Sequence, residues 1–359
     1  MSNPEYQRPP VKVAIMGCGR SMFASHYPVY KAHPALFKVV CACDTIKERR
    51  DMIAKDFPDC RMFRQFSDML DERNIDLVDI ATGSLNHKKH AMMSLEKGFW
   101  TLLETPMALQ TDEALLIRGA AAKAKNKLIV MQRGMFDPDF LIAKAMMSDP
   151  RLGEIHEIVM RKEDYVRIDD WQAVKRMGGG ATYYAMTDML IQALRLLPSA
   201  PIQMWSDLKR IASLGDAEDY AHVMFKTRSN VSADLAYSGG CLKENRSPSF
   251  SILGERGEFS IMPGATQGML TVIEPNLKLP RRRSSVRTPP LSDLHEQLPV
   301  VRIPISLPAG TPHGETMFWK HVYNSVRTAA PFPITIEESI DAVRFAHLMK
   351  KTSPFGMGK

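Results

Sequence analysis

A glycine-rich turn near the start of the chain has the residue types that bind a phosphate group. An apolar run over residues 11–16 leads directly into Gly17-Cys18-Gly19, and a helical pattern follows. Gly17 permits a tight turn, Gly19 lets the backbone approach a pyrophosphate, and the helix N-terminus supplies N–H donors and a partial positive charge. Met22 stands where the usual fingerprint has its third glycine. The turn therefore predicts a dinucleotide site that needs support from a second feature.

That second feature is Asp44, which follows the next predicted strand. A carboxylate at this distance from the turn accepts hydrogen bonds from the adenosine ribose and repels a 2′-phosphate. The two features together predict NAD as the cofactor. Lys47, Arg49 and Arg50 follow on the next predicted helix. A basic side chain there that reached a phosphate would make NADP the cofactor instead.

The elements that position these residues show two different patterns of apolar residues along the chain. Up to about residue 132, short apolar runs alternate with helical segments, which predicts a parallel sheet covered by helices on both faces. Beyond residue 135, longer runs with period-2 alternation are separated by turn signals, which predicts a mainly antiparallel open sheet. We therefore expect a flexible segment at 1–10, an α/β Rossmann domain at 11–132, and an α+β domain at 133–359 for substrate binding and oligomerisation.

The second half contains further predicted elements. We expect a helix over 183–197, long loops over 274–312, and two closing helices over 315–328 and 336–351. The basic cluster Arg281-Arg282-Arg283 lies in the proline- and serine-rich part of those loops, and we interpret it as a solvated loop.

Composition narrows the class of protein. The 359 residues are 45% hydrophobic and 24% charged, which is typical of soluble globular proteins. No apolar run reaches the roughly 18 to 20 residues of a membrane span, and the formal charge of +7 lacks an aromatic-lined basic stripe. We expect neither a membrane nor a nucleic-acid partner. The five cysteines are odd in number and lack metal-type spacing, which indicates reduced thiols in a cytoplasmic protein.

The chain resembles the glucose–fructose oxidoreductase / inositol dehydrogenase / rhizopine-catabolism (Gfo/Idh/MocA) family over nearly its whole length. The resemblance rests on the glycine turn, on Asp44 and on five further segments: Ala81-Thr82-Gly83-Ser84-Leu85-Asn86-His87, Glu104-Thr105-Pro106, Gly178-Gly179-Gly180-Ala181, Asp219-Tyr220-Ala221 and Gly254-Glu255-Arg256-Gly257. It implies a Rossmann domain, an open sheet that often forms a dimer or tetramer interface, and nicotinamide-dependent chemistry at a hydroxyl carbon of a sugar or cyclitol.

Several positions depart from the family pattern. Thr105 stands at the lysine of the family's Glu-Lys-Pro, Met135 at an arginine after the last Rossmann strand, and Tyr184 and Asp188 at an Asp-x-x-x-His pair. Thr105 can hydrogen-bond a hydroxyl but is no base at neutral pH. Asp188 in a desolvated site would have a raised pKa and act as the base. Tyr184, four residues earlier on the same predicted helix face, would contact the reacting oxygen. The alternative is that Tyr184 packs in the core and Asp188 pairs with an arginine.

The remaining candidate residues surround these positions. We expect the cofactor to contact a set that lines one cleft: Gly17, Gly19, Arg20, Ser21, Met22, Asp44, Thr82, His87 and Glu104. Lys175 and Arg176 would bind substrate through charge, and Trp171 and Tyr165 through stacking, unless these two rings pack in the core. His87 and His90 have His-x-x-His spacing without an acidic or cysteine partner, so we expect no metal site.

The leading hypothesis is an NAD(P)-dependent oxidoreductase acting on a sugar, cyclitol or related small molecule, with non-standard proton-transfer residues. We expect a homodimer or homotetramer formed through the second sheet. One alternative is an NAD-dependent glycosidase that cleaves through transient oxidation. The other is a non-catalytic NAD-binding sensor or regulatory protein. Turnover with reduction of the nicotinamide would indicate the oxidoreductase, and glycoside cleavage without net NADH release would indicate the glycosidase. Cofactor binding without chemistry would indicate the sensor.

Overall fold

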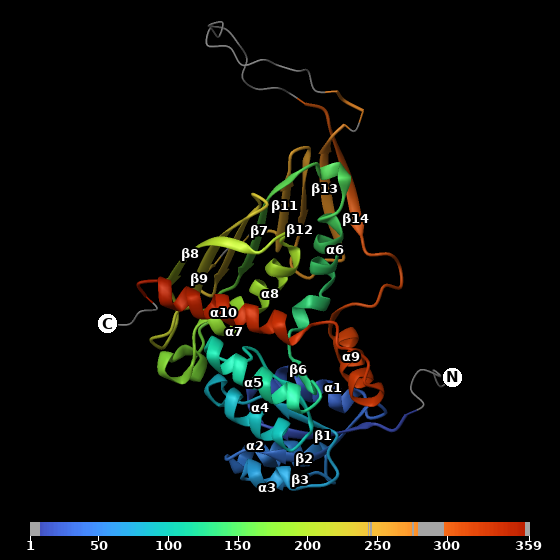
Figure 1. Ribbon diagram of the computed structural model, residues 1–359, viewed down its shortest axis with the longest axis vertical. Helices are drawn as coiled ribbons and strands as arrows, with labels where there is room; N and C mark the ends of the chain where they lie inside the picture. Colours follow the sequence, from blue (N-terminus) through green and yellow to red (C-terminus); the bar gives the residue numbers. More distant parts are fainter. Residues whose placement is uncertain (1–7, 243, 245, 275, 279–297, 356–359) are drawn as a thin grey trace, which may run out of the picture.

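The computed structural model describes residues 8–242, 244, 246–274, 276–278 and 298–355. Two sheets lie one beyond the other along the long axis of the molecule, with helices between and around them (Figure 1). The Arg281-Arg282-Arg283 cluster and residues 1–7 lie outside the described residues. Among the described helices, none is long and apolar enough to cross a membrane.

The first sheet confirms the predicted Rossmann domain. Its strands are all parallel and lie in the order β3-β2-β1-β4-β5-β6, which reverses direction between β1 and β4. Their bounds are β1 Val11–Met16, β2 Phe37–Cys43, β3 Arg61–Phe63, β4 Leu77–Ile80, β5 Trp100–Leu103 and β6 Leu128–Val130. The central strands are buried because helices cover both faces: α1 Tyr27–Ala32, α2 Lys47–Asp56, α3 Phe66–Leu70, α4 His87–Glu96 and α5 Thr111–Lys123.

The helical segment after the glycine turn is divided. A π-helical turn, η2 (Met22–His26), precedes α1. Pro28 lies in the first turn of α1 and has no N–H to continue a regular hydrogen-bond ladder. The turn before it therefore has the wider π-helical hydrogen-bond pattern. The wider turn carries the buried side chain of His26 into the domain.

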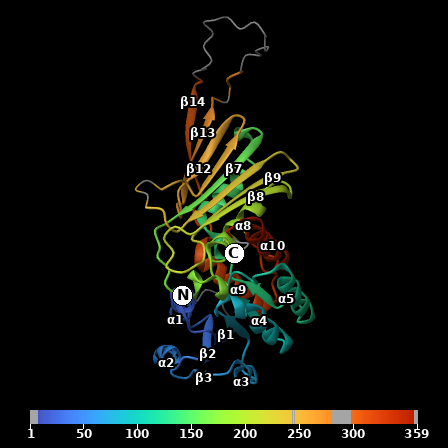
Figure 2. The same ribbon diagram turned by 90° about the vertical axis from the view of Figure 1, so that its left-hand side faces the viewer.

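The second sheet is mainly antiparallel, as predicted. Its order is β14-β13-β12-β11-β7-β10-β9-β8, and only the β7–β10 pair is parallel. The bounds are β7 Ile155–Glu163, β8 Pro201–Lys209, β9 Tyr220–Thr227, β10 Ser232–Ser238, β11 Phe250–Gly254, β12 Gly257–Ile261, β13 Gln267–Ile273 and β14 Val300–Ser306. Helices pack on one face, while the other is open, as Figure 2 shows.

Two parts of the sequence-based description of this domain are wrong. The loops expected over 274–312 contain β14, which pairs with β13, a strand the sequence analysis did not include. Pro304 masked the apolar alternation of β14, but an edge strand tolerates a proline because it lacks a partner on one side. The helix expected over 183–197 is broken at Ala185 into α7 (Ala181–Tyr184) and α8 (Met186–Leu196), where the Thr187 hydroxyl donates to the Tyr183 carbonyl.

The two closing helices connect the domains. Trp319 of α9 (Gly314–Thr328) packs edge-on against Tyr30 and Phe37 of the first domain at ring-centroid distances of 5.3 and 5.5 Å. The α10 helix (Ile336–Thr352) packs against α8 and α5, one from each domain. Residues 314–352 therefore complete both cores, although the chain order alone placed them in the second domain.

Candidate active site

A cleft of about 570 Å³ lies over the carboxyl ends of the first-domain strands. The glycine turn after β1 and Asp44 after β2 line one part of it. Thr82 and Gly83 after β4, and Glu104 and Thr105 after β5, line another part. Crevices at this end of a doubly wound sheet are where such folds bind nucleotides. The strand order and the cleft thus bring together most of the predicted cofactor residues.

The glycine turn leaves the space that a pyrophosphate needs. Gly17 has a φ of 95°, and a Cβ there would lie 2.8 Å from the Ala81 carbonyl oxygen, so only glycine fits without strain. A Cβ on Gly19 would instead meet open space, its nearest atom being an Arg49 nitrogen 3.9 Å away. The residues present therefore fit a dinucleotide: the backbone is held tightly at the first glycine and exposed at the second.

Asp44 is buried at the edge of this turn. Its Oδ2 accepts the N–H of Cys18 at 2.9 Å, and its Oδ1 accepts the N–H of Ile46 at 2.9 Å. These bonds hold the glycine turn against the start of α2. Arg49 lines the same cleft with a guanidinium nitrogen 3.8 Å from Asp44 Oδ2, and so brings a cation to the adenosine end.

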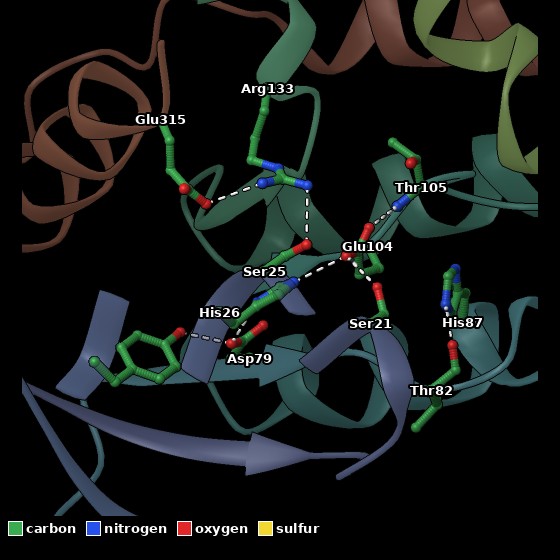
Figure 3. A network of polar contacts seen from close by, with 11 residues as sticks. Ser21, Ser25, His26, Asp79, Thr82, His87, Glu104, Thr105, Arg133 and Glu315 are labelled. Carbon is green, nitrogen blue, oxygen red and sulfur yellow. Dashed lines mark hydrogen bonds and ion pairs between the residues drawn. The ribbon is translucent and has the colours of Figure 1, made fainter. Parts of the chain in front are cut away.

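His26 forms a buried ionic network at the opposite end of the cleft (Figure 3). Its Nδ1 lies 2.8 Å from Asp79 Oδ2, and its Nε2 lies 2.8 Å from Glu104 Oε1. The Tyr30 hydroxyl donates to the same Asp79 oxygen. Burial acts to lower the pKa of His26, but the charges and hydrogen bonds of the two carboxylates outweigh it and raise that pKa to about 10. The imidazolium therefore ties η2 to the ends of β4 and β5.

Glu104 is a fixed anion in this network. Its Oε1 also accepts the Ser21 hydroxyl at 2.7 Å, and its Oε2 accepts the Thr105 N–H at 3.0 Å. Burial acts to raise its pKa, but His26 first, and then Ser21, lower it to about 2. A carboxylate with this pKa holds neighbouring donors in place and is no proton acceptor near neutral pH. Thr105 lines the cleft beside it.

Arg133 is a site residue that the sequence analysis missed. It lies in the 3₁₀ turn η4 (Arg133–Phe136), directly after β6. Its guanidinium donates to Ser25 Oγ at 3.0 Å and to Glu315 at 2.9 Å, as Figure 3 shows. Ser25 lines the dinucleotide cleft, and Arg133 lines a second cavity of about 440 Å³. The guanidinium therefore joins the lining of the second cavity to that of the first through a hydrogen bond. The residue taken from the motif alignment, Met135, is buried instead.

Asp188 lines that second cavity, which lies under the helix-covered face of the eight-stranded sheet. Its Oδ1 is buried and has no hydrogen-bond partner. Burial raises the pKa of Asp188 to about 6, against the charge of Lys162, which acts to lower it. A carboxyl with this pKa is a suitable general base near neutral pH.

Tyr184 does not accompany Asp188. The break at Ala185 separates their helix turns, and neither cavity is lined by Tyr184. Its ring packs perpendicular to Tyr237 at 5.7 Å, and burial raises its pKa well above the usual range. The alternative that Tyr184 packs in the core thus describes its position.

The predicted substrate residues lie in different places. Trp171 lines the dinucleotide cleft and packs over Gly83. Lys175 lies on the Phe355 ring at 3.9 Å, outside both cavities, and Arg176 and Tyr165 are exposed and also outside them.

Other predicted cofactor residues divide in the same way. Arg20 and Ser21 line the cleft, and Arg20 forms an ion pair of 2.8 Å with Asp170 of the second domain. Met22 is fully buried in the core. His87 is buried, with its Nδ1 2.7 Å from the Pro106 carbonyl and its Nε2 2.8 Å from the Thr82 carbonyl, so it braces the loop that carries Thr82.

Comparison with known proteins identifies the family. Residues 11–132 match the oxidoreductase family with an NAD-binding Rossmann fold, and residues 140–260 match the GFO/IDH/MocA C-terminal domain. The chain belongs to the Gfo/Idh/MocA family of oxidoreductases, as the sequence resemblance predicted, and its first domain is an NAD-binding Rossmann domain.

Individual relatives are more distant. An uncharacterised oxidoreductase of Schizosaccharomyces pombe is 31% identical over 192 residues, or 52% of each chain. The scyllo-inositol 2-dehydrogenase (NADP(+)) IolW of Bacillus subtilis is 22% identical over 353 residues, covering 96% of this chain and 94% of that one. The solved WlbA dehydrogenase of Bordetella pertussis, in complex with NADH and UDP-GlcNAcA, superposes with a TM-score of 0.75 at 17% identity, covering 96% of each chain. This last similarity supports the fold.

Proposed function

We propose that this protein is an NAD(P)-dependent oxidoreductase that acts on a hydroxyl or carbonyl carbon of a sugar, cyclitol or related molecule, with Asp188 as the proton acceptor. The observation that carries this proposal is the buried, unpartnered Oδ1 of Asp188 in a cavity whose Arg133 donates a hydrogen bond to Ser25 of the dinucleotide cleft. The inositol dehydrogenase activity in the name of the B. subtilis relative supports the substrate class.

The bound cofactor supplies a two-electron acceptor or donor at its nicotinamide ring. The residues of this chain then have separate tasks. The glycine turn and Asp44 hold the adenosine and pyrophosphate part, and the network around Glu104 fixes the walls at the other end. Asp188 takes the proton of the hydroxyl that is being oxidised. Thr105 contributes a hydroxyl to the cleft in place of the lysine of the family pattern, and we assign it an orienting role.

Turnover of a panel of hydroxylated compounds tests the proposal. The wild-type protein is incubated with NAD⁺ or NADP⁺ and with inositols, aldoses, sugar acids and sugar phosphates, and reduced nicotinamide is followed by absorbance. We expect oxidation of at least one class, with kcat/KM rising as the pH passes about 6, the pKa of Asp188. Asp188→Asn should lower kcat roughly 10²- to 10⁴-fold and leave NADH binding unchanged.

Asp59→Asn is the matched control, because Asp59 is exposed and outside both cavities. Tight NADH binding with no turnover of any class would contradict the proposal and favour the sensor alternative. Cleavage of a chromogenic glycoside without net NADH release would favour the glycosidase.

A further inference from the structure

Lys162 faces the same cavity as Asp188. It lies on β7 two residues beyond Met160, and both residues line the cavity, Lys162 being exposed there. The side chain of Lys162 makes no hydrogen bond or ion pair with any described residue. Its charge is nevertheless the largest charge effect on Asp188. An ammonium group and a carboxylate thus share a cavity without contacting each other directly.

Most of the other charged groups around Asp188 form hydrogen bonds or ion pairs with other residues. Arg133 is bound to Glu315 and Ser25, and Glu104 is bound within the His26 network. Asp137 also lines the cavity. Burial and the charge of Asp139 raise its pKa, while Arg133 first, and then Lys162, act to lower it. The Asp137 side chain, like that of Asp188, has no hydrogen-bond partner in the described part of the chain.

Six carboxylates and four cations line the cavity. Most of them have hydrogen-bond or ion-pair partners: Asp139, Glu163, Asp164, Glu315, Arg133, Arg161 and Arg246. Two acceptor carboxylates and one donor ammonium remain for a ligand. A carboxylate or phosphate on the substrate would meet the repulsion of both acidic groups. An apolar ligand would desolvate three charges without compensation. A neutral polyhydroxylated ligand matches the set, because each hydroxyl donates one hydrogen bond to a carboxylate and accepts one from an ammonium.

From this geometry we infer that Lys162 and Asp188 hold the reacting hydroxyl of a neutral polyol between them, while Asp137 binds a second hydroxyl. The inference rests on the proposed function. Lys162 on β7 would then supply the cation at the reacting oxygen. It would take the place of the family's lysine, where this chain has Thr105.

In the oxidation step every proton and electron has a destination. The O–H bond of the substrate breaks and its proton passes to the Asp188 carboxylate. The C–H bond at the same carbon breaks, and its two electrons leave as hydride to the oxidised nicotinamide. The C=O double bond forms, so the substrate loses two electrons and the cofactor gains them. The Lys162 ammonium stabilises the negative charge that develops on the oxygen and keeps its own proton.

The test compares Lys162→Met and Lys162→Arg with the control Lys144→Met, since Lys144 is exposed on α6 (Pro138–Met146) and outside the cavity. With a polyol that wild type oxidises, Lys162→Met should lower kcat/KM on the order of 10²-fold, as for loss of one preorganised donor. Lys162→Arg should restore part of it. The apparent pKa of the kcat/KM profile should move upward from about 6 in Lys162→Met.

A second measurement needs no turnover. Carbon NMR of labelled aspartate carboxyls titrates Asp188 directly, with Asp188→Asn for assignment, and calorimetry measures scyllo-inositol, glucuronate and inositol monophosphate binding to the NADH complex. We expect the Asp188 pKa to rise in Lys162→Met, and only the neutral polyol to bind in the cavity. An unchanged Asp188 titration, or tighter binding of either anion, would overturn the inference. Absent turnover with the expected titration and polyol binding would contradict the proposed function alone.

Discussion

The Nε2 atom of His26 lies 2.8 Å from Oε1 of Glu104, so a buried imidazolium joins the helical turn after β1 to the end of β5. His26 is fully buried and also contacts Asp79. Each of these groups is costly to bury without the others, because an unpaired charge in the interior loses its hydration without compensation. The network thus stabilises the wall of the cleft only as a complete set.

Replacing His26 should destabilise the protein strongly. His26→Gln leaves Asp79 and Glu104 without a cation, and breaking a buried pair in this way costs about 3–5 kcal/mol. Urea unfolding followed by circular dichroism measures the change. His33→Gln, at an exposed position after α1, should change stability by no more than about 0.5 kcal/mol. Equal stability of the two variants would contradict the charged state assigned to His26.

Stability should also depend on pH in a defined direction. The folded-state pKa of His26, about 10, lies above its ordinary value of 6.5. Its contribution is therefore complete below pH 6.5 and is lost as the pH rises through 10. The pKa of Glu104 is lowered from 4.5 to about 2, so its contribution is present above pH 4.5 and is lost as the pH falls toward 2. Unfolding midpoints from pH 6.5 to 10 should fall in wild type, with a smaller fall in His26→Gln.

The second glycine of the turn should matter for cofactor binding more than for folding. Gly19→Val places a side chain in the open space of the cleft, where a pyrophosphate approaches the backbone. We expect NADH affinity, measured by fluorescence titration, to fall at least roughly 10-fold, equivalent to about 1.4 kcal/mol. Gly119→Ala is the control, because a Cβ at that α5 position meets nothing within 4 Å. A similar loss of affinity in both variants would argue against this position of the phosphates.

Arg49 should influence the choice between NAD and NADP. Its guanidinium stands beside Asp44 at the adenosine end of the cleft, where a 2′-phosphate would lie. Arg49→Ala should therefore weaken NADPH binding more than NADH binding. Lys47→Ala, which removes an exposed lysine paired with Asp51, should leave the ratio unchanged. An equal effect of Arg49→Ala on both cofactors would contradict a role in recognising the 2′-phosphate.

We expect copies of the chain to associate through the open face of the second sheet. Trp205 and Met224 face each other on neighbouring strands and are 53% and 42% exposed, an arrangement that favours burial against a partner. Trp205→Glu should shift the mass measured by light scattering toward the monomer, whereas the exposed Leu116→Glu on α5 should not. A wild-type monomer would contradict the expectation.

The sequence was sufficient for features that depend on local pattern. Gly17, Gly19 and Asp44 follow apolar strands, and the parallel order of those strands brings them to one cleft. His26 and Arg133 were missed because each acts through partners far along the chain: Asp79 and Glu104 for the first, and Glu315 for the second. One signal was present. Asp79 lies inside a buried apolar strand, and a carboxylate in that position requires a partner.

The break at Ala185 shows a different limit. Residues four apart share a helix face only if the helix is continuous, and here it is interrupted at Ala185, whose φ is −127°. Motif spacing therefore located Asp188 in the cavity but gave Tyr184 the wrong surroundings. Lys162 had no motif to mark it, because only the fold brings β7 and α8 to one cavity.

The docking of Trp319 among Tyr30 and Phe37 has a consequence for biosynthesis. A ribosome completes the strands of the first domain long before it reaches residue 319, and domains generally fold as units in the order of synthesis. Here the nascent nucleotide domain must wait with an apolar surface uncovered until the last tenth of the chain emerges. The order of synthesis thus supplies part of the first domain's core well after the strands of that domain.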